Sequence, residues 1–185
     1  MVPWVLAGVD LGADVLEIGP GPGLTTDLLR RRVPRLTSIE IDEALARRLR
    51  ERLVDTNVTV VQGDAAHLAV PEGFFTGATA FTMLHHVALP SLQDRLLAEV
   101  ARVLQPGGVF VGFDSTGGWR FRLNHVFDTG VPVDPDGLPD RLRAAGFDAV
   151  RVDTLKGAFR FRAHRPITQN EHPRGAGART DRGAG

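Results

Sequence analysis

Short apolar runs alternate with amphipathic stretches along most of the chain. Five mostly apolar runs are bounded by Gly, Pro, Asp or Asn, and they lie at residues 15–18, 36–40, 58–61, 78–81 and 109–113. Runs of this length and composition predict buried strands. Residues 150–154 and 159–163, joined by Lys156-Gly157, predict a final antiparallel pair.

Between these runs, apolar positions recur at helical spacing. Helices are expected at residues 25–33, from Asp42 through Leu53, at 91–104 and at 139–145. The first should end before Pro34, because proline lacks the N–H that continues a helix. Strands alternating with helices predict an α/β protein with a doubly wound, mostly parallel sheet and helices on both of its faces.

Composition narrows the class of protein further. The 185 residues include 22 basic and 22 acidic side chains and neither cysteine nor tyrosine. Because these charges cancel, the net charge gives no electrostatic support for nucleic-acid binding. The lack of cysteine excludes disulfides and thiolate catalysis. No metal site is expected. No apolar run approaches the ~20 residues of a membrane span and no signal peptide is visible, so we expect a cytoplasmic protein without membrane contact.

The length predicts one domain, which we place at residues 1–165. Residues 166–185 carry almost no large apolar side chain, and we expect them to form a disordered tail. Nothing in the pattern fixes the oligomeric state.

A glycine-rich turn follows the first strand. Gly19, Gly21 and Gly23 alternate with prolines, and Glu17 precedes them. The dinucleotide fingerprint G-x-G-x-x-G requires glycine where Leu24 stands, and Glu17 would repel a phosphate. This charge pattern favours a nucleoside ligand that carries a cation and an unphosphorylated ribose.

This turn and four later segments, in order, resemble the class I S-adenosylmethionine-dependent methyltransferases over about residues 15–166. The segments lie at residues 17–23, 40–41, 62–65, 81–87 and 102–108. The resemblance implies a Rossmann-like seven-stranded sheet with strand order 3-2-1-4-5-7-6, in which strand seven is antiparallel. It also implies S-adenosyl-L-methionine as the cofactor.

The resemblance assigns roles to individual residues. Glu40 would bind the ribose, Ile41 would lie against adenine, and Asp64 would accept from the adenine amino group. The segment that begins at Phe81 would face the methionine moiety. The expected cofactor-binding residues are Glu17, Gly19, Pro20, Gly21, Gly23, Glu40, Ile41, Asp64, Ala65, Phe81 and Thr82.

Catalytic residues are harder to assign, because transfer from a sulfonium depends mainly on alignment and needs a base only for a protonated acceptor. His85 and His125 are the candidates for orienting or deprotonating the acceptor, with His125 inside a long connection at residues 115–136. His86 is expected to hold the turn after the fourth strand, and His67 to lie at the surface. Asp114 could act as a base or as a helix cap.

Three functions remain open. The first is methyl transfer to a small organic acceptor, with no nucleic acid as partner. The second is an enzyme similar to the ribosomal RNA adenine dimethyltransferases, whose glycine motif is close to residues 16–25. Their Asn-Leu-Pro-Tyr type segment is replaced here by Thr82-Met83-Leu84-His85.

The third is a cofactor-binding module without turnover of its own. Only residues 1–13 precede the first strand, where most relatives carry helices that close the active site. A further departure from the family is Thr76, which stands where an acid is common.

Overall fold

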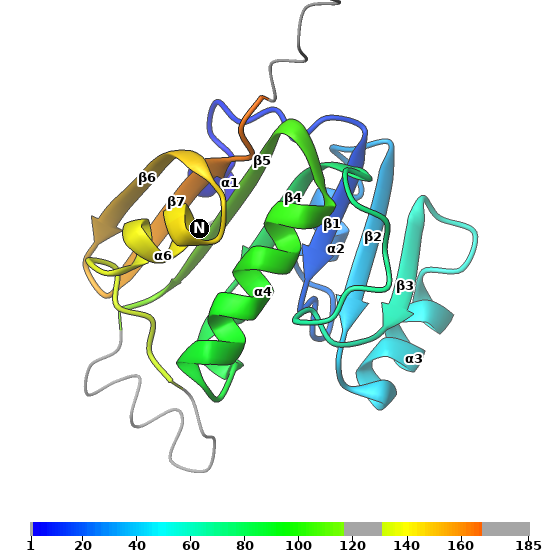
Figure 1. The fold of residues 1–185 in the computed structure, drawn as a ribbon. Helices are drawn as coiled ribbons and strands as arrows, with labels where there is room; N and C mark the ends of the chain where they lie inside the picture. The colour runs from blue at the N-terminus through cyan, green and yellow to red at the C-terminus, as the bar shows by residue number, and fades with distance from the viewer. Residues whose placement is uncertain (1, 117–130, 168–185) are drawn as a thin grey trace, which may run out of the picture.

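A seven-stranded sheet organises the computed structural model, which describes residues 2–116 and 131–167 (Figure 1). Its strand order is β3-β2-β1-β4-β5-β7-β6. The strands are β1 Asp14–Ile18, β2 Arg35–Glu40, β3 Val58–Gln62, β4 Phe75–Phe81, β5 Leu104–Ser115, β6 Asp148–Leu155 and β7 Ala158–His164. Strands β1 to β5 pair in parallel, and β7 runs antiparallel between β5 and β6. The expected fold class and strand order are confirmed.

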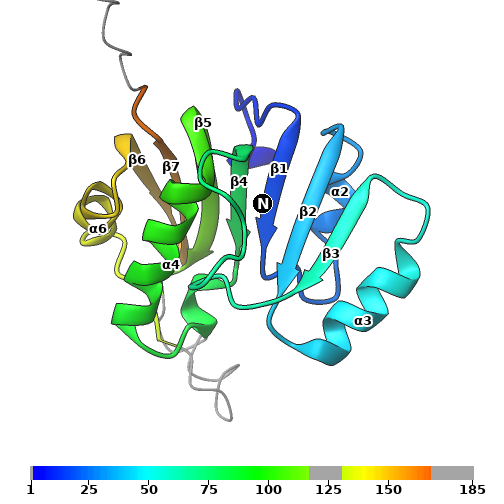
Figure 2. The same cartoon turned by 45° about the vertical axis from the view of Figure 1, so that its right-hand side comes forward.

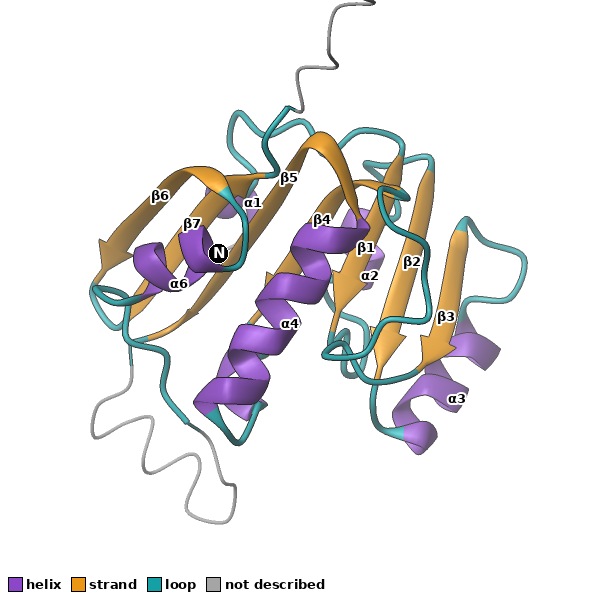
Figure 3. Ribbon diagram, viewed as in Figure 1, coloured by secondary structure: helices purple, strands orange, loops and turns teal. Residues whose placement is uncertain are grey.

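Helices cover both faces of this sheet, as Figures 2 and 3 show. They are α1 Val2–Val5, α2 Thr26–Leu29, α3 Glu43–Arg52, α4 Pro90–Val103 and α6 Leu138–Ala144, with a 3-10 turn, η1, at Leu84–His86. Helices α4 and α6 share a buried apolar cluster with Leu16, Ile18 and Phe110. Helices α1 and α2 share another with Val15 and Val111. Successive side chains of β1 thus pack into the apolar clusters on opposite faces of the sheet, as expected for a strand buried on both faces.

The first helix after the glycine turn is shorter than expected. The prediction of a helix at residues 25–33 is wrong in length, because α2 ends at Leu29. Pro34 cannot donate to the carbonyl of Arg30, which the Asn57 side chain reaches instead, with an N–O distance of 2.9 Å. The same amide lies 2.8 Å from the carbonyl oxygen of Val33. The side chain of the residue just before β3 therefore stabilises a turn where the pattern indicated a helix.

Thr76 has a structural role at the position where the resemblance led us to expect an acid. Its hydroxyl donates to the carbonyl oxygen of Leu11 at 2.8 Å and accepts from the N–H of Asp14 at 3.0 Å. The hydroxyl thus fastens the segment before β1 to β4. A side chain that both donates and accepts can do this, whereas an ionised carboxylate only accepts.

The N-terminal helix is anchored on β7. The guanidinium carbon of Arg160 lies 4.5 Å from the ring centre of Trp4, and its Nη1 donates to the Trp4 carbonyl oxygen at 2.5 Å. Arg160 also pairs with Asp153 of β6 at 2.9 Å. Within the described part of the chain, no helix is long and apolar enough to cross a membrane.

Candidate functional site

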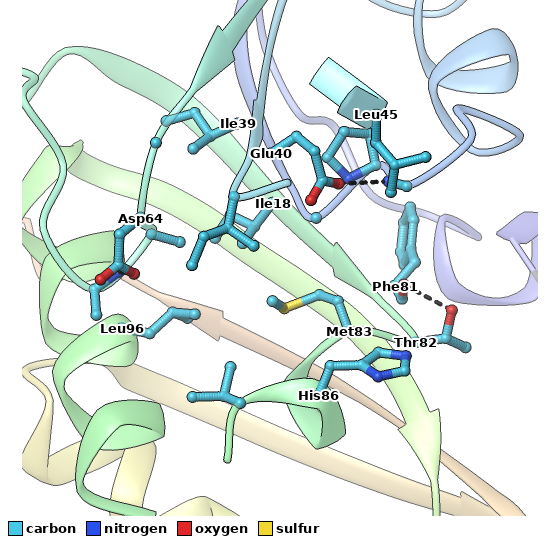
Figure 4. Close-up of a pocket in the computed structure, with 18 of the residues that line it drawn as sticks. Ile18, Ile39, Glu40, Leu45, Asp64, Phe81, Thr82, Met83, His86 and Leu96 are labelled. Atoms are coloured by element: carbon cyan, nitrogen blue, oxygen red, sulfur yellow. Dashed lines mark hydrogen bonds between the residues drawn. The ribbon is translucent and has the colours of Figure 1, made fainter. Parts of the chain in front are cut away.

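A cavity of about 810 Å³ opens at the carboxyl ends of the parallel strands (Figure 4). Its wall combines the glycine turn after β1, the end of β2, the loop after β3, η1 and one side of α4. Ligands of open α/β sheets bind at this edge because connections diverge there. Most expected cofactor residues are on the wall, namely Gly19, Pro20, Gly21, Glu40, Ile41, Asp64, Ala65, Phe81 and Thr82. Glu17 and Gly23 are not among the lining residues.

Glu40 presents a rigid carboxylate to the cavity from the end of β2. One oxygen accepts from the N–H of Gly21 at 2.9 Å and the other from the N–H of Asp42 at 3.0 Å. Only 6% of the residue is exposed. A carboxylate oxygen can accept more than one hydrogen bond, so both oxygens keep capacity for a ligand donor.

Glycine is needed at two positions of the turn for different reasons. Gly19 has φ +62°, and a Cβ there would lie 2.9 Å from the Cβ of Met83 on the cavity wall. Gly23 has φ +86°, and a Cβ there would lie 2.4 Å from Leu49 of α3. Gly19 therefore lets the turns after β1 and β4 approach each other, whereas Gly23 lets α3 pack under the loop.

Glu17 lies beneath the turn. Its carboxylate accepts from the hydroxyls of Thr25, Thr26 and Ser38 at 2.6–2.7 Å, and the residue is 1% exposed. Burial raises the pKa of Glu17, against the opposing effect of the three donors. The carboxylate thus joins β1, α2 and β2. Its contact with a cofactor stays a prediction.

Asp64 and a set of apolar side chains form another end of the cavity. One Asp64 oxygen accepts from the N–H of Ala66 at 2.8 Å, and this bond, more than any other contact, lowers the pKa of the carboxyl group. Ile41, 67% exposed, lies at the rim. Leu92 and Leu96 of α4 also line this space, although their helical spacing predicted only a core-facing stripe. Sequence spacing carries no signal that one part of that stripe would face a ligand.

The two neighbouring histidines occupy different environments. His85 is buried, with its Nδ1 2.5 Å from Oδ1 of Asp114, while Oδ2 of Asp114 accepts from the His85 N–H at 3.2 Å. His86 lines the cavity, and its ring centre is 4.1 Å from that of His85. His86, which was expected to hold the turn, therefore lies on the cavity wall. His85, a candidate catalytic residue, lies behind it. His125 lies outside the described residues.

Figure 4 shows Glu40, Asp64 and His86 on separate sides of the same cavity. Thr82, beside His86 in this view, has φ +50°. A left-handed backbone is uncommon for a β-branched residue and occurs mainly where surrounding structure enforces it. Here the N–H of Thr82 donates to the Phe113 carbonyl oxygen at 2.8 Å. The end of β5 thus shapes the turn that carries the two histidines.

The fold can be compared with solved structures. A S-adenosylmethionine-dependent methyltransferase from Methanosarcina mazei superposes with a TM-score of 0.74 at 19% identity, over 90% of this chain and 99% of that one. One from Aquifex aeolicus gives 0.70 at 22% identity, over 87% of both chains. At these identities the likeness establishes the fold, which is that of the class I methyltransferases.

Sequence comparison then gives the family. Residues 16–112 match the model of the methyltransferase domain. A probable ribosomal RNA small subunit methyltransferase A of Pyrobaculum aerophilum is 36% identical over 91 residues, 49% of this chain and 40% of that protein. A probable S-adenosylmethionine-dependent methyltransferase of Mycolicibacterium smegmatis is 33% identical over 100 residues, 54% of this chain and 37% of that protein. The chain thus covers less than half the length of these two relatives. It belongs to the methyltransferase domain family, the S-adenosylmethionine-dependent class that its motifs resemble.

Proposed function

We propose that this protein transfers a methyl group from S-adenosylmethionine to an O, N or C atom of a small organic acceptor. The observation that carries the proposal is the fixed Glu40 carboxylate, because its oxygens are suited to the two hydroxyls of an unphosphorylated ribose. No lysine or arginine is among the described lining residues. A phosphate-bearing dinucleotide would therefore meet Glu40 and Asp64 without a compensating cation.

The residues of the wall divide between the parts of the cofactor. Glu40 would hold the ribose, Asp64 and Ile41 the adenine, and the turn from Gly19 with Thr82 the methionine moiety. When bound, S-adenosylmethionine supplies a methyl group already activated by a positive sulfur. The chain's task is then to align the acceptor with that carbon and to exclude water.

Among the described residues of the wall, His86 is ionisable and lies outside the expected nucleoside contacts. In the proposed reaction it orients the acceptor and receives a proton where the nucleophile is an O–H or N–H group. The Asp114–His85 pair packs behind it and holds the turn.

Methylation of ribosomal RNA is the second candidate. Relatives named as ribosomal RNA small subunit methyltransferases favour it, with 36–53% identity over 57–91 residues. The segment from Thr82 to His85 and the lack of a cationic side chain among the described lining residues favour a small acceptor instead. A binding module without turnover is the third candidate.

Calorimetry followed by methyl-transfer assays separates these functions. S-adenosylmethionine and its demethylated product are titrated first, and a protein that binds neither below millimolar concentration contradicts the proposal. Labelled S-adenosylmethionine is then supplied with a metabolite panel and, separately, with small-subunit ribosomal RNA. Label in a metabolite supports the proposal, label in RNA supports the second candidate, and binding without transfer supports the third. A cytoplasmic location is part of the proposal.

A further inference from the structure

The loop between β3 and β4 is tied to α4 at two places. Away from the cavity, Glu99 accepts from the N–H of Leu68 at 2.9 Å, and Arg102 donates to the carbonyl oxygens of Leu68 and Val70 at 2.9 and 2.8 Å. Nearer the cavity, Nη1 of Arg95 lies 3.0 Å from Nε2 of His67. The first tie anchors the loop as a whole, whereas the second lies next to the ligand wall.

The second tie continues to Asp64. Nδ1 of His67 lies 3.1 Å from Oδ2 of Asp64. Arginine has no acceptor, so Nε2 of His67 must accept from Arg95, and the ring proton must be on Nδ1. His67 therefore donates to Asp64, and every donor in the chain from Arg95 to His67 to Asp64 points the same way. Because Oδ1 of Asp64 accepts from Ala66, both carboxylate oxygens have a fixed partner.

The series of hydrogen bonds from Arg95 through His67 to Asp64 connects two walls of the cavity. Asp64 lines it from the loop after β3, and Leu92 and Leu96, which flank Arg95 along α4, line it from the helix. The distance between these walls determines how closely a flat base can be held between them. Arg95 and His67 do not line the cavity themselves.

We propose that His67 and Arg95 are positioning residues for Asp64, which hold it and the loop against α4 for binding of the cofactor's base. The proposal rests on the proposed function of the cavity.

Calorimetry with S-adenosylhomocysteine tests the proposal in the full chain. Arg95→Met should weaken binding about three- to tenfold at about pH 8, the range of one hydrogen bond. The matched control is Arg143→Met, which removes an exposed ion pair with Asp140 on α6 and should leave affinity unchanged. Equal affinities for Arg95→Met and Arg143→Met, with tight wild-type binding, overturn the positioning role and leave the proposed function standing.

Nitrogen-15 spectra of the ligand-free protein test the geometry by itself. The His67 signal, assigned by its loss in His67→Asn, should show the Nδ1-protonated tautomer at about pH 8. The Nε2-protonated tautomer overturns the proposal. The wild-type protein could instead show the expected tautomer but bind neither S-adenosylmethionine nor its product. That result would overturn the proposed function, and with it the role of these hydrogen bonds in ligand binding.

Discussion

Replacement of Glu40 by glutamine tests the proposed ribose site most directly. The carboxylate accepts from two backbone N–H groups, those of Gly21 and Asp42, on different oxygens. Glutamine offers one oxygen and one NH₂ group, so one backbone donor would face another donor. The variant should lose about 1 kcal/mol of unfolding free energy, the net worth of one hydrogen bond.

The effect on binding should be larger. A ribose hydroxyl bound to a carboxylate makes a charge-assisted hydrogen bond worth about 1.5–3 kcal/mol. Neutralising Glu40 should therefore raise the dissociation constant for S-adenosylhomocysteine by roughly ten- to hundredfold. The loss should appear in binding even where the fold is fully populated.

Calorimetry gives the dissociation constant, and urea denaturation followed by circular dichroism gives the stability. Glu43→Gln is the matched control, because Glu43 lies exposed in the first turn of α3 and does not line the cavity. A Glu40→Gln dissociation constant within about twofold of wild type, with the control unchanged, would refute the assignment of Glu40 to the ribose.

Four further variants address the glycine turn, the buried Glu17 and the two histidines. Gly19→Val should destabilise the fold by about 2–4 kcal/mol in urea denaturation, because its Cβ meets Met83 and its φ is positive. Burial raises the pKa of Glu17, so its ionisation is disfavoured in the folded state. The wild-type protein should therefore lose unfolding free energy relative to Glu17→Gln as the pH rises above about 4.5. Parallel curves of stability against pH would contradict this. His85→Ala should cost about 1–3 kcal/mol, because the buried Asp114 carboxyl group loses its ring partner but keeps the backbone N–H groups of residues 85 and 115. His86→Ala should cost about 1 kcal/mol or less yet slow methyl transfer, and equal losses of stability would contradict the different placement of the two rings.

Most strands and helices could be predicted from the sequence, because the spacing of hydrophobic positions differs clearly between the two along this chain. The strand order itself came from the family resemblance, since alternation alone fits several doubly wound orders. The error at residues 25–33 has a long-range cause. The end of α2 depends on the Asn57 amide, which is more than 20 residues away in sequence.

The candidate site was predictable where a residue's backbone forms the cavity wall. Gly19, Gly21 and Glu40 lie at strand ends, and the parallel topology brings such ends together. Glu17 shows the limit, because both faces of a central strand are buried and the sequence does not say which of them meets the ligand. The placement of His86 rather than His85 on the cavity wall could not be predicted for a similar reason, since the 3-10 turn that orients the two rings leaves no periodic signal.

The Asn57 amide has a practical consequence for how this protein is produced. Asn57-Val58-Thr59 is an N-glycosylation acceptor sequence, and its Nδ2 is the atom that a glycan would occupy. That nitrogen donates to carbonyl groups between α2 and β2. A sugar attached there would remove these donors and force the turn next to the glycine loop apart. A secretory host that modifies this sequence should therefore yield misfolded chains, and Asn57→Gln would not rescue them, because its longer side chain displaces the amide from the same carbonyls.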